Sequence, residues 1–222
     1  MISAAILGAT GVIGQELIIA LQNHPWYEIT KVAASKRSAG KKYKKAITDE
    51  EGSLSWYCDE YPNDKILNMK VEEVSEFDPK SVDVIFTALE SDVSKSLEPK
   101  LAKIKPVIST ASAFRYEKDV PVLIPGINSN HSNILNDQKK RRGWEGFIAP
   151  IPNCTTTGLA ITLKPILDKF GLNIVLMTSL QALSGSGRNP GVRGLDIIDN
   201  VIPFIPKEES KVEKETLKIL GK

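Results

Sequence analysis

Residues 2–14 read Ile-Ser-Ala-Ala-Ile-Leu-Gly-Ala-Thr-Gly-Val-Ile-Gly, a largely apolar run that leads into three spaced glycines. The run 2–7 is typical of a strand buried on both faces of a parallel sheet. The segment 15–24, QELIIALQNH, follows with apolar residues at helical spacing, and His24-Pro25 stops it. The stretch therefore predicts a strand, a glycine turn and a helix.

The glycine turn is a candidate nucleotide site. Its pattern, G-x-x-G-x-x-G, differs from the common G-x-G-x-x-G, but it has the required strand before it and helix after it. Glycines let the backbone approach a pyrophosphate, and free N–H groups at a helix start favour the negative charge. A plain tight turn is the alternative. The candidate ligands are Gly8, Thr10, Gly11, Val12, Ile13 and Gly14.

The chain up to about residue 150 alternates strands with helices. We expect further strands at 29–35, 81–89 and 106–110, a helix at 92–104, an extended segment at 120–128, a loop or small hairpin at 41–59, and a charged, solvated helix end rather than an anion patch at 136–146. This alternation predicts an α/β fold with a doubly wound, Rossmann-type parallel sheet.

The pattern changes near residue 150. We expect a dinucleotide-binding domain over 1–150 and an incomplete α+β catalytic and dimerisation domain over 151–222. In the second part we expect a strand that leads into Cys154 and a helix over 154–170 that Pro165 kinks or ends. A β-rich run at 172–183 and a glycine-rich loop at 184–194 follow. The last element is an amphipathic helix at 207–220, with Val212, Leu217, Ile219 and Leu220 as its apolar positions.

The end of the second strand indicates which nucleotide binds. Sites for NAD usually carry Asp or Glu there, but this chain has Ser35-Lys36-Arg37-Ser38. A carboxylate would repel a 2′-phosphate, whereas a guanidinium can form paired hydrogen bonds with it. We therefore predict NADP with Ser35, Arg37 and Ser38 as ligands, against the alternative of an exposed basic turn.

Composition excludes several other classes of function. The net charge of +2 gives no reason to expect nucleic acid or a membrane surface as a partner. Two cysteines cannot build a disulfide framework, and no signal peptide or membrane span is evident, so we expect a cytoplasmic protein. Two histidines without a His/Cys cluster predict no metal site.

Cys154 lies in Pro-Asn-Cys-Thr-Thr-Thr-Gly and has two interpretations. It can be a small buried hydrophobe, as free cysteine often is. It can also be a nucleophile, because the thiolate is the reactive form and helix N-termini favour it. For Cys58, nothing in its surroundings suggests activation.

The motifs GATGVIGQ, AASKRSAGKKY, STASAFRYEKDVPVLIPGIN, PNCTTTGLA and SLQALSGSG, with the 207–220 helix, resemble aspartate-semialdehyde dehydrogenase in its archaeal and fungal branch. They cover essentially the whole chain in the family's order. The resemblance implies an NADP-dependent oxidoreductase that reductively dephosphorylates aspartyl 4-phosphate to aspartate semialdehyde. This step belongs to amino-acid biosynthesis and leads to lysine, threonine and methionine. The complete enzyme is expected to be a homodimer or homotetramer.

The resemblance also assigns roles to residues. Cys154 matches the nucleophile that forms a thioester and expels phosphate, and Gln181 matches the glutamine that orients the substrate. The remaining matches are Asn153 beside the reaction centre, Arg115, Glu208 and Lys211 around the substrate phosphate, and Ser184 and Gly185 near the nicotinamide. Without the resemblance, Arg115 reads equally well as a surface charge beside Glu117 and Asp119.

One part of the family pattern is missing from this sequence. The family's C-terminal region carries a general-base histidine and an arginine for the substrate carboxylate, and neither His24 nor His131 is an obvious substitute. We therefore expect an N-terminal portion that binds NADP but catalyses poorly by itself. The alternatives are an acyl reductase of the malonyl-CoA or N-acetyl-glutamyl-phosphate type, or a non-catalytic NADP-binding remnant.

Overall fold

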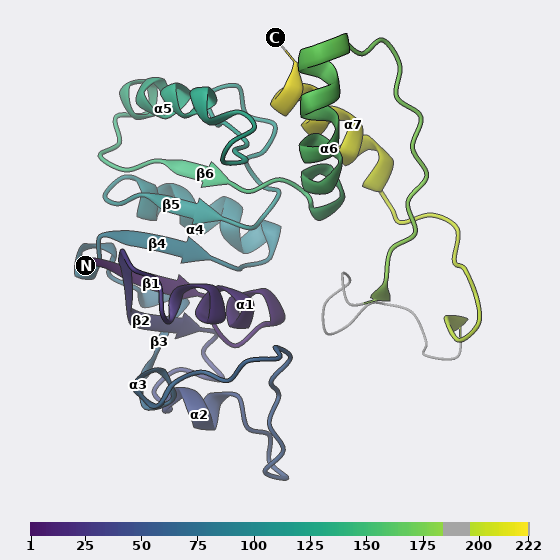
Figure 1. Ribbon diagram of the computed structural model, residues 1–222. Helices are drawn as coiled ribbons and strands as arrows, with labels where there is room; N and C mark the ends of the chain where they lie inside the picture. The colour runs from purple at the N-terminus through teal and green to yellow at the C-terminus, as the bar shows by residue number, and fades with distance from the viewer. Residues whose placement is uncertain (184–195, 222) are drawn as a thin grey trace. The chain divides into compact units, whose positions relative to one another are not determined.

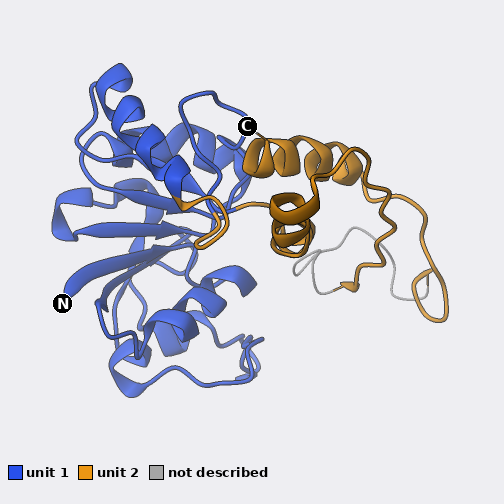
Figure 2. Ribbon diagram, turned by 45° about the horizontal axis from the view of Figure 1, so that its top comes forward, with its two compact units in different colours: residues 1–123, 130–151 blue, residues 124–129, 152–222 orange. Residues whose placement is uncertain are grey.

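The computed structural model describes residues 1–183 and 196–221. These residues divide into two compact units (Figure 2). Unit 1 comprises residues 1–123 and 130–151, and unit 2 comprises residues 124–129 and 152–222.

Unit 1 is built on a six-stranded parallel sheet in the order β3-β2-β1-β4-β5-β6 (Figure 1). The strands are β1 (Ile2–Leu7), β2 (Tyr27–Ala34), β3 (Val71–Glu73), β4 (Val84–Thr87), β5 (Val107–Ser109) and β6 (Ile148–Pro150). The chain adds strands on one side of β1 and then crosses to the other side at β4, which makes the β1/β4 junction a topological switch point. Ligands of doubly wound sheets bind outside the carboxyl ends of the strands at such a point.

Two apolar clusters cover the two faces of this sheet. Side chains of a strand alternate between faces, and β1 follows this rule. Leu7 packs with Leu101 of α4 (Ser91–Ala102) in one cluster. Ile6 packs with Ile18 of α1 (Val12–Leu21) in the other. The predicted doubly wound fold is confirmed.

The segment 41–59 agrees in part with the expected loop or small hairpin, because its antiparallel bridge is hairpin-like, but it also contains a helix that was not expected. It contains a short helix, α2 (Tyr43–Ala46), and an antiparallel bridge between Thr48 and Leu54. A second short helix, α3 (Asp64–Leu67), precedes β3. Tyr43 is fully buried, and its burial explains why this polar segment forms a turn of helix against the core.

The charged segment after residue 130 forms the predicted helix end. Helix α5 (Ile134–Arg142) ends at Gly143, whose φ of 64° is the left-handed conformation that glycine adopts without strain. The chain up to β6 also contains three short 3₁₀ turns, at Val74–Glu76, Pro79–Ser81 and Ser129–Asn133.

Unit 2 contains two long helices that pack on each other, α6 (Cys154–Phe170) and α7 (Glu208–Leu220). Helix α6 continues past Pro165, so the expectation that this proline could end the helix is wrong. Pro165 removes the N–H that would bond to the carbonyl of Ile161. Because Ile161 is 49% exposed, water can satisfy that carbonyl instead.

Two further expectations for unit 2 are wrong. Residues 172–183 form no strand with any described residue, and Ile174 and Leu176 are 81% and 94% exposed. A β-rich sequence becomes a strand only where a neighbour accepts its backbone hydrogen bonds. In α7, Leu217 is 72% exposed, while Glu215 takes a fully buried position.

The glycine-rich stretch 184–194 lies wholly within residues 184–195, outside the described part of the chain. Among the described helices, none combines the length and apolar composition that crossing a bilayer requires. The described residues also contain no group of three or more His, Cys, Asp and Glu side chains arranged to hold a metal ion.

Candidate functional site

The glycine turn of unit 1 has no room for side chains at two of its three glycines. A Cβ on Gly8, whose φ is +84°, would lie 2.2 Å from the carbonyl oxygen of Ala88. A Cβ on Gly14 would lie 2.1 Å from the carbonyl oxygen of Gly8. At Gly11 the nearest atom would be 3.5 Å away, an ordinary contact. The turn is therefore a close-packed backbone cradle, as a dinucleotide pyrophosphate requires.

Helix α1 begins within the glycine turn. Gly11 is its N-cap, and no side chain caps the helix. The first N–H groups of a helix have no acceptor one turn earlier, so Val12, Ile13 and Gly14 can offer theirs to an anion. This arrangement fits the phosphates of NADP.

Two buried side chains support the turn, and the sequence patterns did not reveal either. The Tyr43 hydroxyl donates to the Ala9 carbonyl over 2.7 Å. Gln15 is fully buried; its amide nitrogen donates to the Thr10 carbonyl of the turn over 3.4 Å and to the Ser55 carbonyl over 2.8 Å, and its oxygen accepts from the Tyr57 backbone N–H over 2.9 Å. Gln15 is a polar residue in the apolar pattern of the first helix, and Tyr43 is an aromatic residue in a lysine-rich stretch; each mismatch is the signal that could have identified the residue.

A cavity of about 290 Å³ lies where β2 and β3 end. Ser35, Lys36, Ser96 and Lys100 line it, together with Glu73. Of the three predicted 2′-phosphate ligands, Ser35 lines this cavity and Arg37 is exposed outside its lining. Ser38 is only 3% exposed, which leaves its side chain little access to a ligand.

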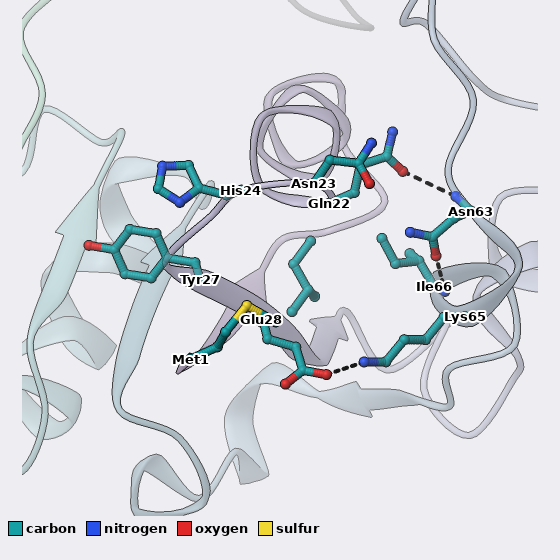
Figure 3. A pocket seen from close by; sticks show the side chains of 10 residues that line it. Met1, Gln22, Asn23, His24, Tyr27, Glu28, Asn63, Lys65 and Ile66 are labelled. Atoms are coloured by element: carbon teal, nitrogen blue, oxygen red, sulfur yellow. Dashed lines mark hydrogen bonds and ion pairs between the residues drawn. The ribbon is translucent and has the colours of Figure 1, made fainter.

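A second cavity of about 300 Å³ opens at the opposite, amino-terminal edge of the sheet (Figure 3). None of the predicted site residues lines it. Several of its polar side chains bond to neighbours: Glu28 pairs with Lys65, and Gln22 accepts from the Asn63 N–H over 3.1 Å. It is separate from the glycine cradle.

Arg115 is buried in unit 1, with 6% of its surface exposed. Its Nη2 donates to the Thr110 carbonyl over 2.9 Å. Arg142 pairs with Glu117 and with Asp119, which accepts two hydrogen bonds of 2.6 Å from it. The surface-charge alternative for Arg115 is therefore wrong.

Cys154 is the first residue of α6 and is exposed. The alternative of a small buried hydrophobe is therefore wrong for this cysteine. The N-cap residue Asn153 holds the start of the helix, because its side-chain oxygen accepts the Thr156 N–H over 3.1 Å. Burial raises the pKa of Cys58 to about 11, with the Glu16 carboxylate adding to the effect, so that thiol stays protonated.

A network in unit 2 joins three predicted site residues, Asn153, Gln181 and Lys211, to a fourth, Glu208. One oxygen of Glu208 accepts from Gln181 over 2.9 Å and from Asn153 and Thr155 over 3.1 Å each. Its other oxygen lies 3.9 Å from the Lys211 ammonium. Gln181 also donates to the Thr155 hydroxyl over 2.8 Å. The Asn153 amide is thus committed to Glu208 and Thr156 within the protein.

Glu208 is held in its charged form by this network. Burial alone would raise its pKa, but the hydrogen bonds from Gln181, Thr155 and Asn153, with the Lys211 charge, outweigh burial and lower the pKa below the usual value. A carboxylate that remains ionised at neutral pH can orient these donors permanently. The predicted residues Ser184 and Gly185 lie outside the described residues.

Comparison with known proteins finds family matches in both the N-terminal and the C-terminal part of the chain. Residues 3–134 match the family described as semialdehyde dehydrogenase, NAD binding domain, and residues 163–222 match semialdehyde dehydrogenase, dimerisation domain. The chain belongs to the semialdehyde dehydrogenase family. Aspartate-semialdehyde dehydrogenase of Archaeoglobus fulgidus is 47% identical over 99% of the chain, and that of Methanothermobacter thermautotrophicus is 43% identical over the whole chain.

A solved structure has the same fold. Aspartate-semialdehyde dehydrogenase from Candida albicans, solved with NADP, aligns over the whole chain with a TM-score of 0.80 and 38% identity. The resemblance to the archaeal and fungal branch is confirmed by these relatives. The chain covers 62% and 61% of the two archaeal relatives and 60% of the Candida albicans chain, so it spans about three fifths of their length.

Proposed function

We propose that this chain is the NADP-binding and nucleophile-bearing part of an NADP-dependent aspartate-semialdehyde dehydrogenase. The observation that carries the proposal is the placement of Cys154: it is exposed, begins α6, and follows an N-cap residue tied to Glu208. Membership of the semialdehyde dehydrogenase family and the NADP complex of the Candida albicans relative support it.

In this proposal, the Cys154 sulfur attacks the acyl carbon of aspartyl 4-phosphate. A carbon–sulfur bond forms, the carbon–oxygen bond to phosphate breaks, and phosphate leaves with the electron pair. Bound NADPH would supply the hydride that reduces the thioester to aspartate semialdehyde; the carbon–sulfur bond then breaks and Cys154 is regenerated as a thiolate. Gln181, held by Glu208 and Thr155, orients the substrate, while Arg115 and Lys211 provide cations for its phosphate.

Loss of the nucleophile tests the reaction. The assay runs in reverse, with aspartate semialdehyde, phosphate and NADP, and follows NADPH formation. We expect Cys154→Ser to abolish turnover while the Kd for NADPH stays unchanged, and Cys58→Ser to retain turnover. A malonyl-CoA-dependent oxidation of NADPH that exceeds turnover of the aspartyl substrate would contradict the substrate assignment. NADPH binding with no Cys154-dependent turnover would favour a non-catalytic remnant.

We infer that NADP rather than NAD is the cofactor. The cavity at the end of β2 presents Ser35, Lys36 and Lys100, which suit a 2′-phosphate, and β2 ends without the acid of NAD sites. Arg37 and Ser38 do not line the cavity and remain candidates from the sequence alone. Lys36→Glu should weaken NADPH binding by roughly tenfold or more and leave NADH binding nearly unchanged, because only NADPH carries the extra phosphate.

Lys44→Glu is the matched control for this cofactor test. Lys44 is an exposed cation of α2 that does not line the cavity. Equal effects of the two substitutions, or a Kd for NADPH no tighter than that for NADH, would refute the NADP assignment.

We further propose that the nucleotide-binding domain extends over 1–150, that the first part of the catalytic and dimerisation domain occupies 151–222, and that the full enzyme is a homodimer or homotetramer. The match of residues 163–222 to a dimerisation domain supports the oligomer. Light scattering on the purified full-length enzyme measures its mass; a monomer at micromolar concentration would contradict the oligomer.

A further inference from the structure

Helix α7 holds Asn153 with two carboxyl groups. Glu208 and Glu215 are seven residues apart, two helical turns, so they lie on the same side of the helix. Glu208 accepts from the Asn153 side-chain amide over 3.1 and 3.2 Å. Glu215 accepts from the Asn153 backbone N–H over 2.7 Å. Both donors of the residue before Cys154 are thus bonded to one helix.

The two acceptors of Asn153 are bonded to α6. Its side-chain oxygen accepts the Thr156 N–H over 3.1 Å, and its carbonyl accepts the Thr157 N–H over 2.9 Å and the Thr157 hydroxyl over 3.0 Å. Every polar group of Asn153 is therefore used. Because Cys154 follows directly, fixing Asn153 fixes the direction in which the Cys154 side chain leaves the backbone.

Burial of the Glu215 carboxyl group costs free energy at this position of α7. It is fully buried, whereas Glu213, on the same helix, is exposed. Packing of α7 is already provided by apolar residues such as Val212 and Ile219. A buried carboxyl group costs free energy unless it is hydrogen-bonded. The Asn153 N–H precedes the helix and has no intrahelical acceptor, so it needs an outside partner.

From these contacts we propose that Glu215 is a positioning residue for the Cys154 nucleophile. It would act through Asn153, without touching substrate or cofactor. Its bond sets the backbone at the last residue before the helix, so that the Cys154 sulfur stays at the start of α6 in one orientation. The catalytic meaning of this role rests on the proposed function, but the bond and its effect on the thiol do not.

The first test uses the unmodified chain. Hydrogen exchange resolved at single amides should show the Asn153 N–H protected to about the same degree as the interior of α6, although it precedes the helix. An Asn153 N–H that exchanges at the rate of an unstructured peptide would overturn the proposal without any variant having to fold.

The second test measures the rate at which iodoacetamide alkylates Cys154, in a Cys58→Ser background. Glu215→Ala should slow alkylation about fivefold or more, because a loosened first turn no longer directs its N–H groups to the thiolate. Glu215→Gln should restore most of the rate, since its amide oxygen can accept the same N–H. Glu213→Ala and Glu213→Gln are the matched controls and should leave the rate unchanged.

The outcomes distinguish the positioning role of Glu215 from an effect of its negative charge, and they do not depend on the proposed function. Equal slowing by Glu215→Ala and Glu215→Gln, or no slowing by either, would overturn the positioning role. Neither alkylation nor exchange needs substrate or NADP, so both remain informative if the aspartate-semialdehyde assay fails. Where turnover is measured, Glu215→Ala should lower kcat and leave the KM for NADP unchanged, and a raised KM alone would count against the proposal.

Discussion

The Tyr43 hydroxyl donates a 2.7 Å hydrogen bond to the backbone carbonyl of Ala9, in the middle of the glycine turn. Tyr43 is fully buried, and that burial raises its pKa, so the phenol stays a neutral donor over the working pH range. A short helix that the sequence presents as a lysine-rich loop therefore supports the backbone that is proposed to face the cofactor phosphates.

Tyr43→Phe should destabilise the protein and the glycine turn together. The substitution leaves the buried Ala9 carbonyl without its donor, which costs about 1–3 kcal/mol in free energy of unfolding. Urea unfolding measures this loss, and calorimetry should show weaker NADPH binding. Tyr61→Phe is the control, because Tyr61 is 51% exposed. A Tyr43→Phe protein as stable as the control would contradict a role for this bond.

Gly14→Ala and Gly11→Ala should differ sharply in their effect on the stability of the fold. A Cβ at position 14 meets the Gly8 carbonyl at 2.1 Å, whereas one at position 11 meets nothing closer than 3.5 Å. Overpacking of this kind typically costs about 1–3 kcal/mol or more, so Gly14→Ala should lower the midpoint of urea unfolding clearly. Gly11→Ala should change it little. Similar midpoints for the two variants would mean that the close approach at Gly14 is not rigid.

The two cysteines should label at very different rates. Cys154 is exposed, whereas Cys58 has a pKa raised to about 11 and is partly buried. At pH 8 only about one Cys58 in a thousand is then a thiolate. Limiting iodoacetamide followed by peptide mass spectrometry should find the label on Cys154, and Cys154→Ser should remove nearly all of it. Comparable labelling of Cys58 would contradict this expectation.

The pair Asp119–Arg142 should make stability depend on pH in the acid range. The hydrogen bonds from Arg142, opposed by burial, hold the pKa of Asp119 below its usual value. A lowered folded-state pKa stabilises the protein above the unfolded-state pKa of about 3.9, and this contribution is lost as pH falls through the folded-state pKa. Asp119→Asn should therefore cost about 1–3 kcal/mol at pH 7 and much less near pH 2.

Asp168→Asn is the control for this pH experiment. Asp168 pairs with Lys164 one helical turn away, but its side chain is 57% exposed. Surface pairs of this kind contribute about 0.5 kcal/mol or less. Urea unfolding of both variants between pH 2 and pH 7 gives the comparison, and a pH-independent loss for Asp119→Asn would show that the ionised pair is not its source.

The sheet of unit 1 followed closely from the sequence. Strands buried on both faces of a parallel sheet need continuous apolar residues, and that requirement is visible at β1 and β4 without knowledge of the fold. The family resemblance was likewise evident from short motifs. The errors fell where a local pattern needs a distant partner, as in residues 172–183, which form no strand with any described residue.

The sequence by itself determined the parallel sheet, the glycine turn and the cysteine before the helix, because these depend on local spacing of apolar residues, glycines and one proline-asparagine pair. Only the tertiary structure decided that Cys154 is exposed, that Arg115 is buried, and that Glu208 and Glu215 hold Asn153 across 55 and 62 residues of chain. Burial and long-range hydrogen bonds are properties of surfaces brought together by folding. The periodicity of the sequence does not show which glutamate of this charged helix is buried and accepts a hydrogen bond from a backbone N–H.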